Sequence, residues 1–303
     1  MKLFYIFLAT SCFAVPRRNN TTTENPEITP ENETSIVDKK SRIINGSPVL
    51  DARSFPSYAS IRRFGNDHLC GGVILDEYRI LTATHCDINT NWDTVIVGWI
   101  KRDGSDKQQE LKIKTVWNHP DYIPEDDNGN TILENDITVI ELDSAIDFNA
   151  SDVEPIEIGN EEEFGKVRNE MSDCQIVGHG YIDGQNSVVD QLHVTNQVYT
   201  TDKCQNYRDN SGQCFLTRGK AGYSQACQGD SGGPLYCDVG TGNKLFGIVS
   251  FVKTTRCDKG LTGLTSPMKY TSFIEDTYPY DDNACPSFKL HLILAFIFTS
   301  TLL

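Results

Sequence analysis

Three residues in this chain are of the types that carry nucleophilic catalysis. Ser231 lies in the segment GDSGGP, His85 in LTATHC and Asp136 in NDITVIEL. A serine hydroxyl attacks a carbonyl only if a base takes its proton, a third group orients that base, and donors stabilise the oxyanion that forms. Glycines on both sides of Ser231 allow a tight turn that directs backbone amides at a substrate carbonyl. Together the three segments predict hydrolysis of peptide bonds by a serine nucleophile.

Each of these residues also has an ordinary structural interpretation. A serine in a glycine-rich turn more often belongs to the turn itself, a histidine after an apolar run is more often a packed side chain, and an aspartate before a strand can cap it. Their occurrence together favours catalysis. Four other histidines have no role that the sequence supports: His68, His119, His179 and His193.

The elements that position these residues are predicted to be β-strands. Short runs rich in β-branched and aromatic residues recur between turn signals, at residues 71–84, 94–100, 111–117, 136–142, 174–182, 192–200, 232–237 and 245–252. This spacing is typical of antiparallel sandwiches or barrels, and not of alternating strands and helices. One helix is predicted, at about 270–278. The acidic stretch GNEEEFGKVRNE, which begins at Gly159, predicts a junction between two groups of strands.

The two ends of the chain differ in composition from its middle. Residues 1–15 combine a Lys2 flank, an apolar run and a small residue, which predicts a secretory signal peptide. Residues 16–42 are rich in Thr, Asn, Glu and Pro and are expected to be a disordered propeptide. Residues 286–303 form an apolar tail, which is either a cleaved lipid-anchor signal or a packed or frayed terminus. Acceptor sequences for N-glycosylation begin at Asn19, Asn20, Asn32 and Asn149.

Charge and cysteine content narrow the possible functions. The chain carries 42 acidic and 27 basic residues, so it is a poor candidate for binding nucleic acid or an anionic membrane. Nine of its ten cysteines remain once a signal peptide containing Cys12 is removed. None of them shows the paired CxxC spacing of a zinc site, so disulfides with one cysteine left over are expected in an exported protein. No metal or other cofactor is predicted.

The order His85, Asp136, Ser231, with GDSGGP unchanged, resembles the secreted serine proteases of the trypsin and chymotrypsin family. The resemblance covers nearly all of the part expected to fold, a protease domain at 43–285. It implies an all-β fold of two six-stranded antiparallel Greek-key barrels, at about 43–160 and 161–280. A C-terminal helix follows, and the active site lies in the cleft between the barrels.

The chain departs from the family's usual residues at two positions. Thr84, directly before the histidine, replaces the usual alanine. His179, in the segment VGHG, replaces the usual tryptophan. We interpret His179 as a packing substitution and not as a second catalytic group.

The resemblance assigns further roles to residues around the nucleophile. It places the oxyanion hole on the backbone amides of Gly229 and Ser231, and a hydrogen bond from Ser250 behind Asp136. It implies four disulfides: Cys70–Cys86, Cys174–Cys237, Cys204–Cys214 and Cys227–Cys257. Cys285 is left over, and cleavage for a lipid anchor near Asp282 would remove it.

The segment SRIINGS resembles the activation site of this family. Cleavage after Arg42 by a trypsin-like protease would free the ammonium group of Ile43. In the family this group turns inward and pairs with the aspartate before the nucleophile, here Asp230. A buried ion pair that forms only after cleavage can act as a switch.

Three residues are expected to form the specificity pocket: Gln225, Val252 and Gly263. Trypsin-like relatives carry an aspartate six residues before the nucleophile, and Gln225 cannot supply its charge to a substrate lysine or arginine. Val252 should obstruct large aromatic side chains, while Gly263 leaves the opposite wall open. We expect small or medium neutral residues before the cleaved bond. In the alternative, Gln225 folds away and leaves an apolar slot of the chymotrypsin type.

The expected partners are protein or peptide substrates, an activating trypsin-like protease and protein inhibitors. The expected location is outside the cell, either free or anchored to the outer surface. The acidic loop at 122–136 would border the subsites upstream of the cleaved bond, or is simply a solvated surface loop. The alternative from another functional class is a catalytically silent protease fold that binds or inhibits. The sequence favours an enzyme, because all three catalytic residue types and the neighbouring glycines remain.

Overall fold

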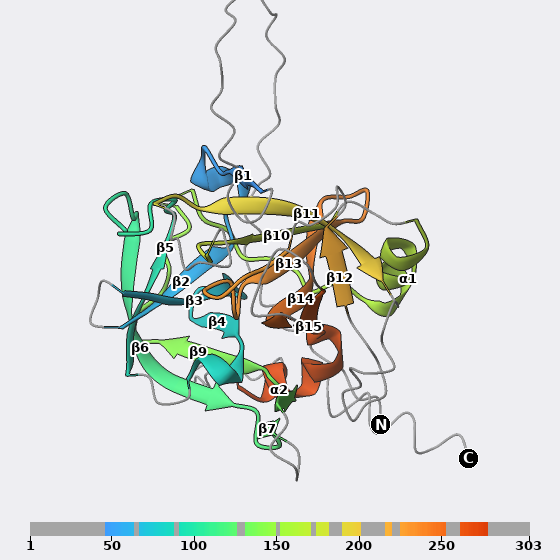
Figure 1. The fold of residues 1–303 in the computed structure, drawn as a ribbon. Helices are drawn as coiled ribbons and strands as arrows, with labels where there is room; N and C mark the ends of the chain where they lie inside the picture. Colours follow the sequence, from blue (N-terminus) through green and yellow to red (C-terminus); the bar gives the residue numbers. More distant parts are fainter. Residues whose placement is uncertain are drawn as a thin grey trace, which may run out of the picture. The chain divides into compact units, whose positions relative to one another are not determined.

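Two antiparallel β-barrels make up most of the described chain (Figure 1). The computed structural model describes residues 46–63, 67–87, 91–125, 131–149, 152–170, 174–181, 190–200, 216–219, 225–252 and 261–277. All of these residues belong to one unit of the chain, residues 40–303.

The first barrel is a closed ring of six strands in the order β2-β3-β4-β9-β6-β5, drawn in blue to green in Figure 1. Its strands are β2 (Tyr58–Arg63), β3 (Asp67–Ile74), β4 (Arg79–Thr82), β5 (Trp92–Val97), β6 (Gln109–Asn118) and β9 (Thr138–Leu142). The pairing of β2 with β5, which sets Ala59 opposite Val97, closes the ring. A separate two-stranded sheet joins β7 (Ile123–Glu125) and β8 (Thr131–Glu134).

The second barrel has six strands in the order β11-β10-β13-β14-β15-β12, and β12 pairs back with β11. Its strands are β10 (Cys174–Gly178), β11 (His193–Thr200), β12 (Leu216–Gly219), β13 (Pro234–Asp238), β14 (Asn243–Val252) and β15 (Thr262–Thr265). The short strand β1 (Ser47–Pro48) pairs with the first two residues of β11. The two barrels confirm the predicted fold class.

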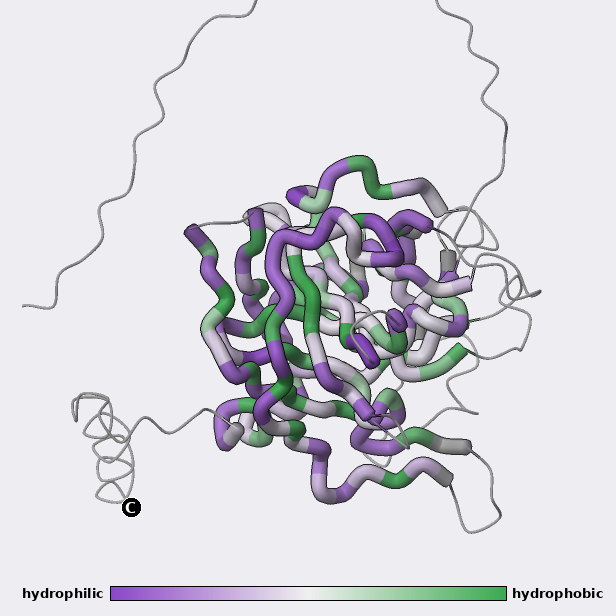
Figure 2. The backbone as a smooth tube through the Cα atoms, turned by 90° about the vertical axis from the view of Figure 1, so that its left-hand side faces the viewer, coloured by the Kyte–Doolittle hydropathy of each residue, from purple (hydrophilic) through white to green (hydrophobic). Residues whose placement is uncertain are grey.

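Branched aliphatic residues with buried side chains recur along the strands of both barrels, which explains why these sequences form strands. Figure 2 shows hydrophobic and hydrophilic residues interspersed along the chain. In the first barrel Val73, Ile80 and Val139 are completely buried. In the second barrel Ile176 and Leu235 are completely buried as well. The larger cluster of buried apolar residues also includes Val177, Tyr236 and Ile248 of the second barrel, so apolar packing continues from one barrel into the other.

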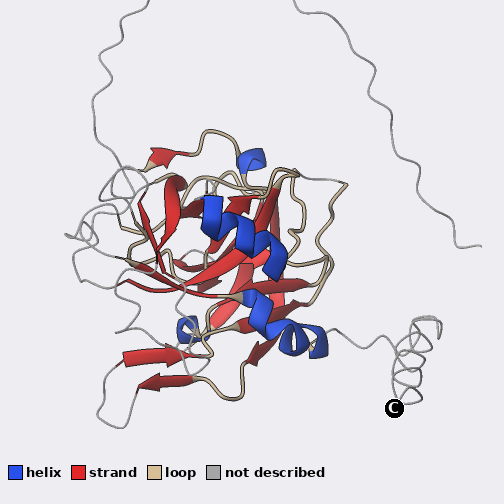
Figure 3. Ribbon diagram, turned by 90° about the vertical axis from the view of Figure 1, so that its right-hand side faces the viewer, coloured by secondary structure: helices blue, strands red, loops and turns tan. Residues whose placement is uncertain are grey.

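The part of the chain that the structure describes has two α-helices, which lie outside the barrels (Figure 3). The C-terminal helix α2 (Thr271–Asp276) follows the 3-10 helix η4 (Pro267–Tyr270) and confirms the predicted helix. Arg79, on β4, donates to the carbonyl of Ile274 at 2.6 Å, which attaches α2 to the first barrel.

Helix α1 (Glu161–Glu170) lies in the acidic stretch where the sequence analysis predicted a junction and no helix. Asn160 and Glu163 begin it with a reciprocal capping box, in which each backbone N–H donates to the other side chain at 3.0 Å. The pattern Asn-x-x-Glu, which is typical of a capping box, could have predicted the start of this helix. The sequence analysis interpreted the acidic composition of this stretch as a junction and did not use the signal.

Candidate active site

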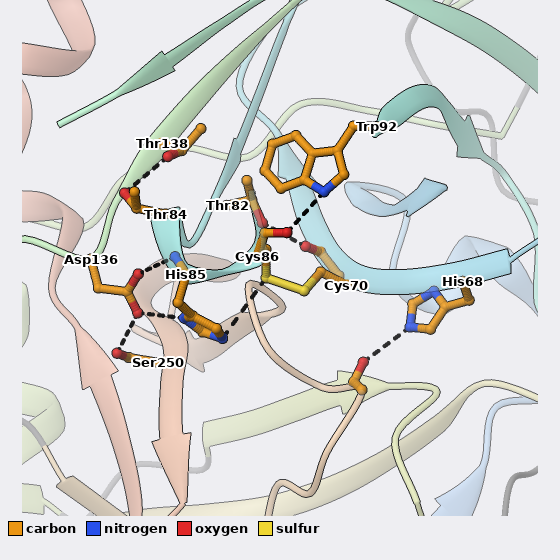
Figure 4. The surroundings of a disulfide bond; sticks show 12 residues. His68, Cys70, Thr82, Thr84, His85, Cys86, Trp92, Asp136, Thr138 and Ser250 are labelled. Carbon is orange, nitrogen blue, oxygen red and sulfur yellow. Dashed lines mark hydrogen bonds and ion pairs between the residues drawn. A yellow bond between two sulfur atoms is a disulfide. The ribbon is translucent and has the colours of Figure 1, made fainter. Parts of the chain in front are cut away.

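His85 and Asp136 form a hydrogen-bonded pair at one edge of the first barrel (Figure 4). His85 lies in the 3-10 helix η2 (Thr84–Cys86), and Asp136 lies two residues before β9. His85 Nδ1 is 2.7 Å from Asp136 Oδ2, and the backbone N–H of His85 donates to Asp136 Oδ1 at 2.8 Å. Since a carboxylate only accepts hydrogen bonds, the proton of the neutral imidazole lies on Nδ1. Nε2 is then left with a lone pair that can accept a proton.

Ser250 completes the surroundings of the carboxylate from the second barrel. Its hydroxyl donates to Asp136 Oδ2 at 2.5 Å, as the sequence analysis expected. Asp136 is completely buried, so a charged carboxylate there depends on these donors. The carboxylate is therefore held from two barrels at once.

Ser231 lies on a tight turn directly before β13 of the second barrel, and this turn contacts the first barrel. Its carbonyl accepts from the N–H of Gly71, on β3, at 2.8 Å. Gly229 and Gly232 on either side adopt left-handed backbone conformations, with φ of +96° and +72°. Within the described residues Ser231 makes no hydrogen bond to His85, whose Nε2 lies 3.9 Å from the sulfur of Cys86. Catalytic hydrogen bonds are commonly long in unliganded sites and shorten when substrate binds.

The side chain of Asp230 supports this turn from inside. Its two carboxylate oxygens accept from the backbone N–H groups of Gly180 and Cys227, each at 2.8 Å. A Cβ on Gly178 would lie 2.1 Å from Asp230 Oδ1, and one on Gly180 would lie 2.5 Å from the carboxyl carbon. Burial raises the pKa of Asp230 to about 6, although the two hydrogen bonds and the charge of Arg102 act in the opposite direction. The GHG segment at the end of β10 therefore packs closely around this carboxylate.

His68 contacts the same turn and was not recognised in the sequence. Its Nε2 is 3.0 Å from the carbonyl oxygen of Gly229, and its Nδ1 is 2.7 Å from Ser60 Oγ. The carbonyl can only accept, so Nε2 carries the proton and Nδ1 accepts from the serine hydroxyl. Burial, assisted by the charge of Arg102, lowers the pKa of His68 to about 3. A neutral histidine therefore fixes the Gly229 peptide.

His179 is buried in an aromatic stack. Its ring lies parallel to that of Trp99, with 4.1 Å between the centroids and 8° between the planes. The guanidinium of Arg62 also lies over the Trp99 ring, at 4.7 Å from its centroid. Arg102 donates to the His179 carbonyl, and burial holds the pKa of His179 well below its usual value. These contacts agree with the interpretation of His179 as a packing residue.

The three residues expected to form the pocket have different surroundings. Gln225 is 1% exposed, and neither polar atom of its amide has a hydrogen-bond partner among the described residues. Val252, which is half-buried, packs against the core of the second barrel. The space in front of Gly263 holds the ring of Phe251, which a Cβ on Gly263 would approach to 2.2 Å. Phe251 lies opposite Gly263 on the paired strand β14, so its ring is the direct neighbour of this glycine.

Two of the expected disulfides lie within the described residues, Cys70–Cys86 and Cys174–Cys237. Cys227 is also disulfide-bonded. The other residues of the expected disulfides and of the activation site lie outside the described residues: Cys204, Cys214, Cys257, Arg42 and Ile43. Cys285, which was expected to be left over, also lies outside them. The part of the chain that the structure describes contains no group of His, Cys, Asp and Glu side chains able to hold a metal ion. None of its helices is long and apolar enough to cross a membrane.

Comparison with known proteins identifies a family. A family model described as Trypsin matches residues 43–274. The chain is 26% identical over 247 residues to chymotrypsin-like elastase family member 1 of Bos taurus, covering 78% of this chain and 89% of that protein. It is 31% identical over 221 residues to tonin of Rattus norvegicus, covering 69% and 81% of the two chains.

Among solved structures, the chain is similar to neuropsin, a serine protease expressed in the limbic system of mouse brain. The TM-score is 0.63 at 24% sequence identity, and the match covers 77% of this chain and 98% of that one. This likeness supports the two-barrel fold. Because the family model matches most of the chain, the protein belongs to the trypsin and chymotrypsin family of serine proteases, which are endopeptidases.

Proposed function

We propose that the protein is a secreted serine endopeptidase in which Ser231 is the nucleophile, His85 the general base and Asp136 the group that orients the base. One observation carries this proposal, the hydrogen-bonded chain from Ser250 through the buried Asp136 carboxylate to His85 Nδ1. It leaves His85 Nε2 as an acceptor in the segment that faces the GDSGGP turn.

The proposed reaction passes through an acyl-enzyme. Ser231 Oγ attacks the substrate carbonyl while its proton moves to His85 Nε2, and the N–H groups of Gly229 and Ser231 stabilise the oxyanion. The imidazolium then protonates the leaving amine. His85 then takes a proton from water as the water attacks the acyl group. The bond from the acyl group to Ser231 Oγ breaks, Ser231 takes that proton back from His85, and the acid is released. Asp136 stays ionised and stabilises the imidazolium in both steps.

Activation is proposed to follow cleavage after Arg42 by a trypsin-like protease. The freed ammonium of Ile43 would then bind the Asp230 carboxylate. Two backbone N–H groups hold that buried carboxylate, and its pKa is raised to about 6, so a neighbouring cation would stabilise its charged form. Residues 1–15 are proposed as the signal peptide and 16–42 as the released propeptide.

We propose a preference for small or medium neutral residues before the cleaved bond. The Gln225 amide is buried without hydrogen-bond partners among the described residues and carries no charge, so a lysine or arginine side chain would lack a counter-ion there. An uncharged polar side chain could instead hydrogen-bond the amide.

The remaining proposals concern the setting of the enzyme. We propose protein or peptide substrates, protein inhibitors and an extracellular location. The protein would attach to the outer cell surface only if residues 286–303 are a lipid-anchor signal. A catalytically silent binding or inhibitory protein is the second candidate, and the hydrogen bond between His85 and the buried Asp136 favours the enzyme over it.

A peptide-library cleavage profile of the protein cut after Arg42 tests this proposal. We expect cleavage after small or medium neutral residues, and no cleavage by the Ser231→Ala variant prepared in the same way. Dominant cleavage after arginine or lysine would overturn the proposed specificity while leaving the proposed reaction intact. Absence of any cleavage by folded, correctly cut protein would favour the silent alternative.

A further inference from the structure

The segments that carry His85 and Asp136 both lie outside the barrel strands. η2 is only three residues long, and Asp136 precedes the first residue of β9, Thr138. Strand pairing therefore does not fix either segment directly, although the two side chains must keep a hydrogen bond of 2.7 Å. The pairing of β4 with β9 ends at Thr82 and Thr138, and beyond it the backbone N–H of His85 contacts the Asp136 side chain, so a further contact between the two backbones would add to their alignment.

Thr84 supplies such a connection, and Figure 4 shows it beside the catalytic pair. Its side chain is buried, and its hydroxyl donates to the carbonyl of Ile137 at 2.7 Å. This contact joins the residue directly before His85 to the residue directly after Asp136. The Ile137 carbonyl also accepts from the N–H of His119 at 3.1 Å, so two donors hold it.

A second hydroxyl fixes the first one. Thr138 Oγ1 lies 2.9 Å from Thr84 Oγ1 and 2.6 Å from Asn118 Oδ1. The proton of Thr84 is committed to the Ile137 carbonyl, so its oxygen is an acceptor for Thr138, which shares its single hydroxyl proton between Thr84 Oγ1 and Asn118 Oδ1. The Thr84 rotamer is therefore determined by donors and acceptors on both sides, in a buried position where an unpaired hydroxyl is costly.

The opposite side of Asp136 is held as well. Asn135 adopts a left-handed conformation with φ of +52°, and its carbonyl accepts from the N–H of Ile137 across Asp136 at 2.9 Å. The Asn135 amide donates to the carbonyl of Asp121 at 2.7 Å and accepts from the Tyr270 hydroxyl at 3.1 Å. Asp136 is thus the apex of a tight turn. With one flank anchored in this way, the Thr84 contact controls the other flank.

We propose that Thr84 is a positioning residue for the His85–Asp136 pair. This inference rests on the proposed catalytic roles of those two residues. Its hydroxyl sets the distance between the two backbones, and through it the angle at which Asp136 meets His85 Nδ1. Catalytic groups must be held within about 0.5 Å of productive geometry, so a loosened backbone lowers the rate of the chemical step without changing substrate binding. Relatives usually carry alanine at this position, so the device is a feature of this chain.

The test compares Thr84→Val, which removes the hydroxyl and keeps the shape, with Thr84→Ser, which keeps the hydroxyl. We expect Thr84→Val to lower kcat by roughly 3- to 10-fold, the effect of one lost hydrogen bond, with KM changed less than about 2-fold. Thr84→Ser should restore kcat to within about 2-fold of the parent. Thr84→Ala gives a second hydroxyl-free variant if the valine variant does not fold, and the same criteria then apply to it.

A matched control is Thr217→Val, because Thr217 is completely buried and its hydroxyl has no hydrogen-bond partner among the described residues. It should leave kcat unchanged. A separate readout is the low-field proton NMR resonance of His85 Nδ1–H, which should shift or broaden in Thr84→Val and not in Thr217→Val. Unchanged kcat and resonance in the hydroxyl-free variants, or loss of activity that serine does not restore, would overturn the inference. An inactive parent protein would instead refute the proposed function.

Discussion

At the scale of single residues, Asp230 has the most consequential environment. It is completely buried, and burial raises its pKa to about 6, well above the value of an unfolded chain. The folded protein therefore holds a proton on Asp230 at pH values where the unfolded chain has lost it. The stabilisation from this group is complete below about pH 4 and is lost as the pH rises through about 6.

Asp230→Asn in the inactive Ser231→Ala background, left uncut after Arg42 so that no Ile43 ammonium is free, tests this pH dependence. Asparagine cannot ionise, and its NH₂ group, placed against backbone N–H donors, gives a penalty that does not depend on pH. Between about pH 4 and pH 7 the parent should lose on the order of 2 to 3 kcal/mol of unfolding free energy relative to the Asp230→Asn variant. Urea denaturation of both proteins across this range measures the difference. A difference that stays constant with pH would contradict the raised pKa.

The sequence revealed residues whose signal is local and missed those whose signal is not. Ser231, His85 and Asp136 each lie in a short recognisable segment, so their types and order predicted the site. His68 was missed because its partner is the carbonyl of Gly229, 161 residues away. Every residue has a backbone carbonyl, so the sequence does not show which one accepts a hydrogen bond. Only the folded chain brings His68 and Gly229 together.

At the scale of elements, the end of β10 shapes the nucleophile turn. The segment from Gly178 to Gly180 lies so close to the Asp230 carboxylate that neither glycine has room for a Cβ. Sequence analysis treated this segment as a strand with an unusual histidine. The need for the flanking glycines follows from a contact with a turn that lies far along the chain, which no local pattern reveals.

Gly180→Ala should destabilise the protein by roughly 1 to 3 kcal/mol, because the new methyl group overlaps the Asp230 carboxyl group. The matched control is Gly165→Ala in α1, where a Cβ meets nothing within 4 Å. This change should stabilise the protein by up to about 1 kcal/mol, since alanine favours helix. Urea denaturation of both variants in the Ser231→Ala background measures the effects. Equal stability of the two variants would refute the proposed close packing of the Gly178–Gly180 segment against Asp230.

At the scale of the whole molecule, the candidate site exists only where the two barrels meet. His85 and Asp136 come from the first barrel, and Ser231 and Ser250 from the second. The barrels approach closely at Gly71, where a Cβ would lie 2.7 Å from the Cα of Gly233. The N–H of Gly71 also donates to the Ser231 carbonyl. This contact therefore sets the position of the Ser231 backbone relative to the first barrel, which carries His85.

Gly71→Ala should therefore separate the nucleophile from its base. A displacement of about 1 Å between catalytic groups can lower kcat by roughly 100-fold, and we expect a loss of about 10- to 100-fold here. Circular dichroism should still report folded barrels, because the change lies at their contact and not in either core. Steady-state kinetics on a cleaved peptide, with Gly165→Ala as control, measures the loss. An unchanged kcat would show that the barrel contact does not set the site.

The fold as a whole was predictable from the motifs and the strand spacing, but not every strand was. β2 carries two arginines, which suggest an exposed segment, yet Arg62 is completely buried against the Trp99 ring. Such burial depends on a cation–π contact and on the neighbouring Ser60 hydroxyl, which accepts from Arg62 Nε at 3.0 Å. Those partners become visible only once the barrel is closed.

The central claim is that Ser231 is a nucleophile activated by His85. The most direct test is labelling with a fluorophosphonate after cleavage at Arg42, with mass spectrometry to locate the label. We predict a single label on Ser231, no label on Ser231→Ala, and labelling slowed by roughly 1,000-fold or more in His85→Ala, which lacks the base. Correctly cut and folded protein that takes up no label on Ser231 would contradict the claim.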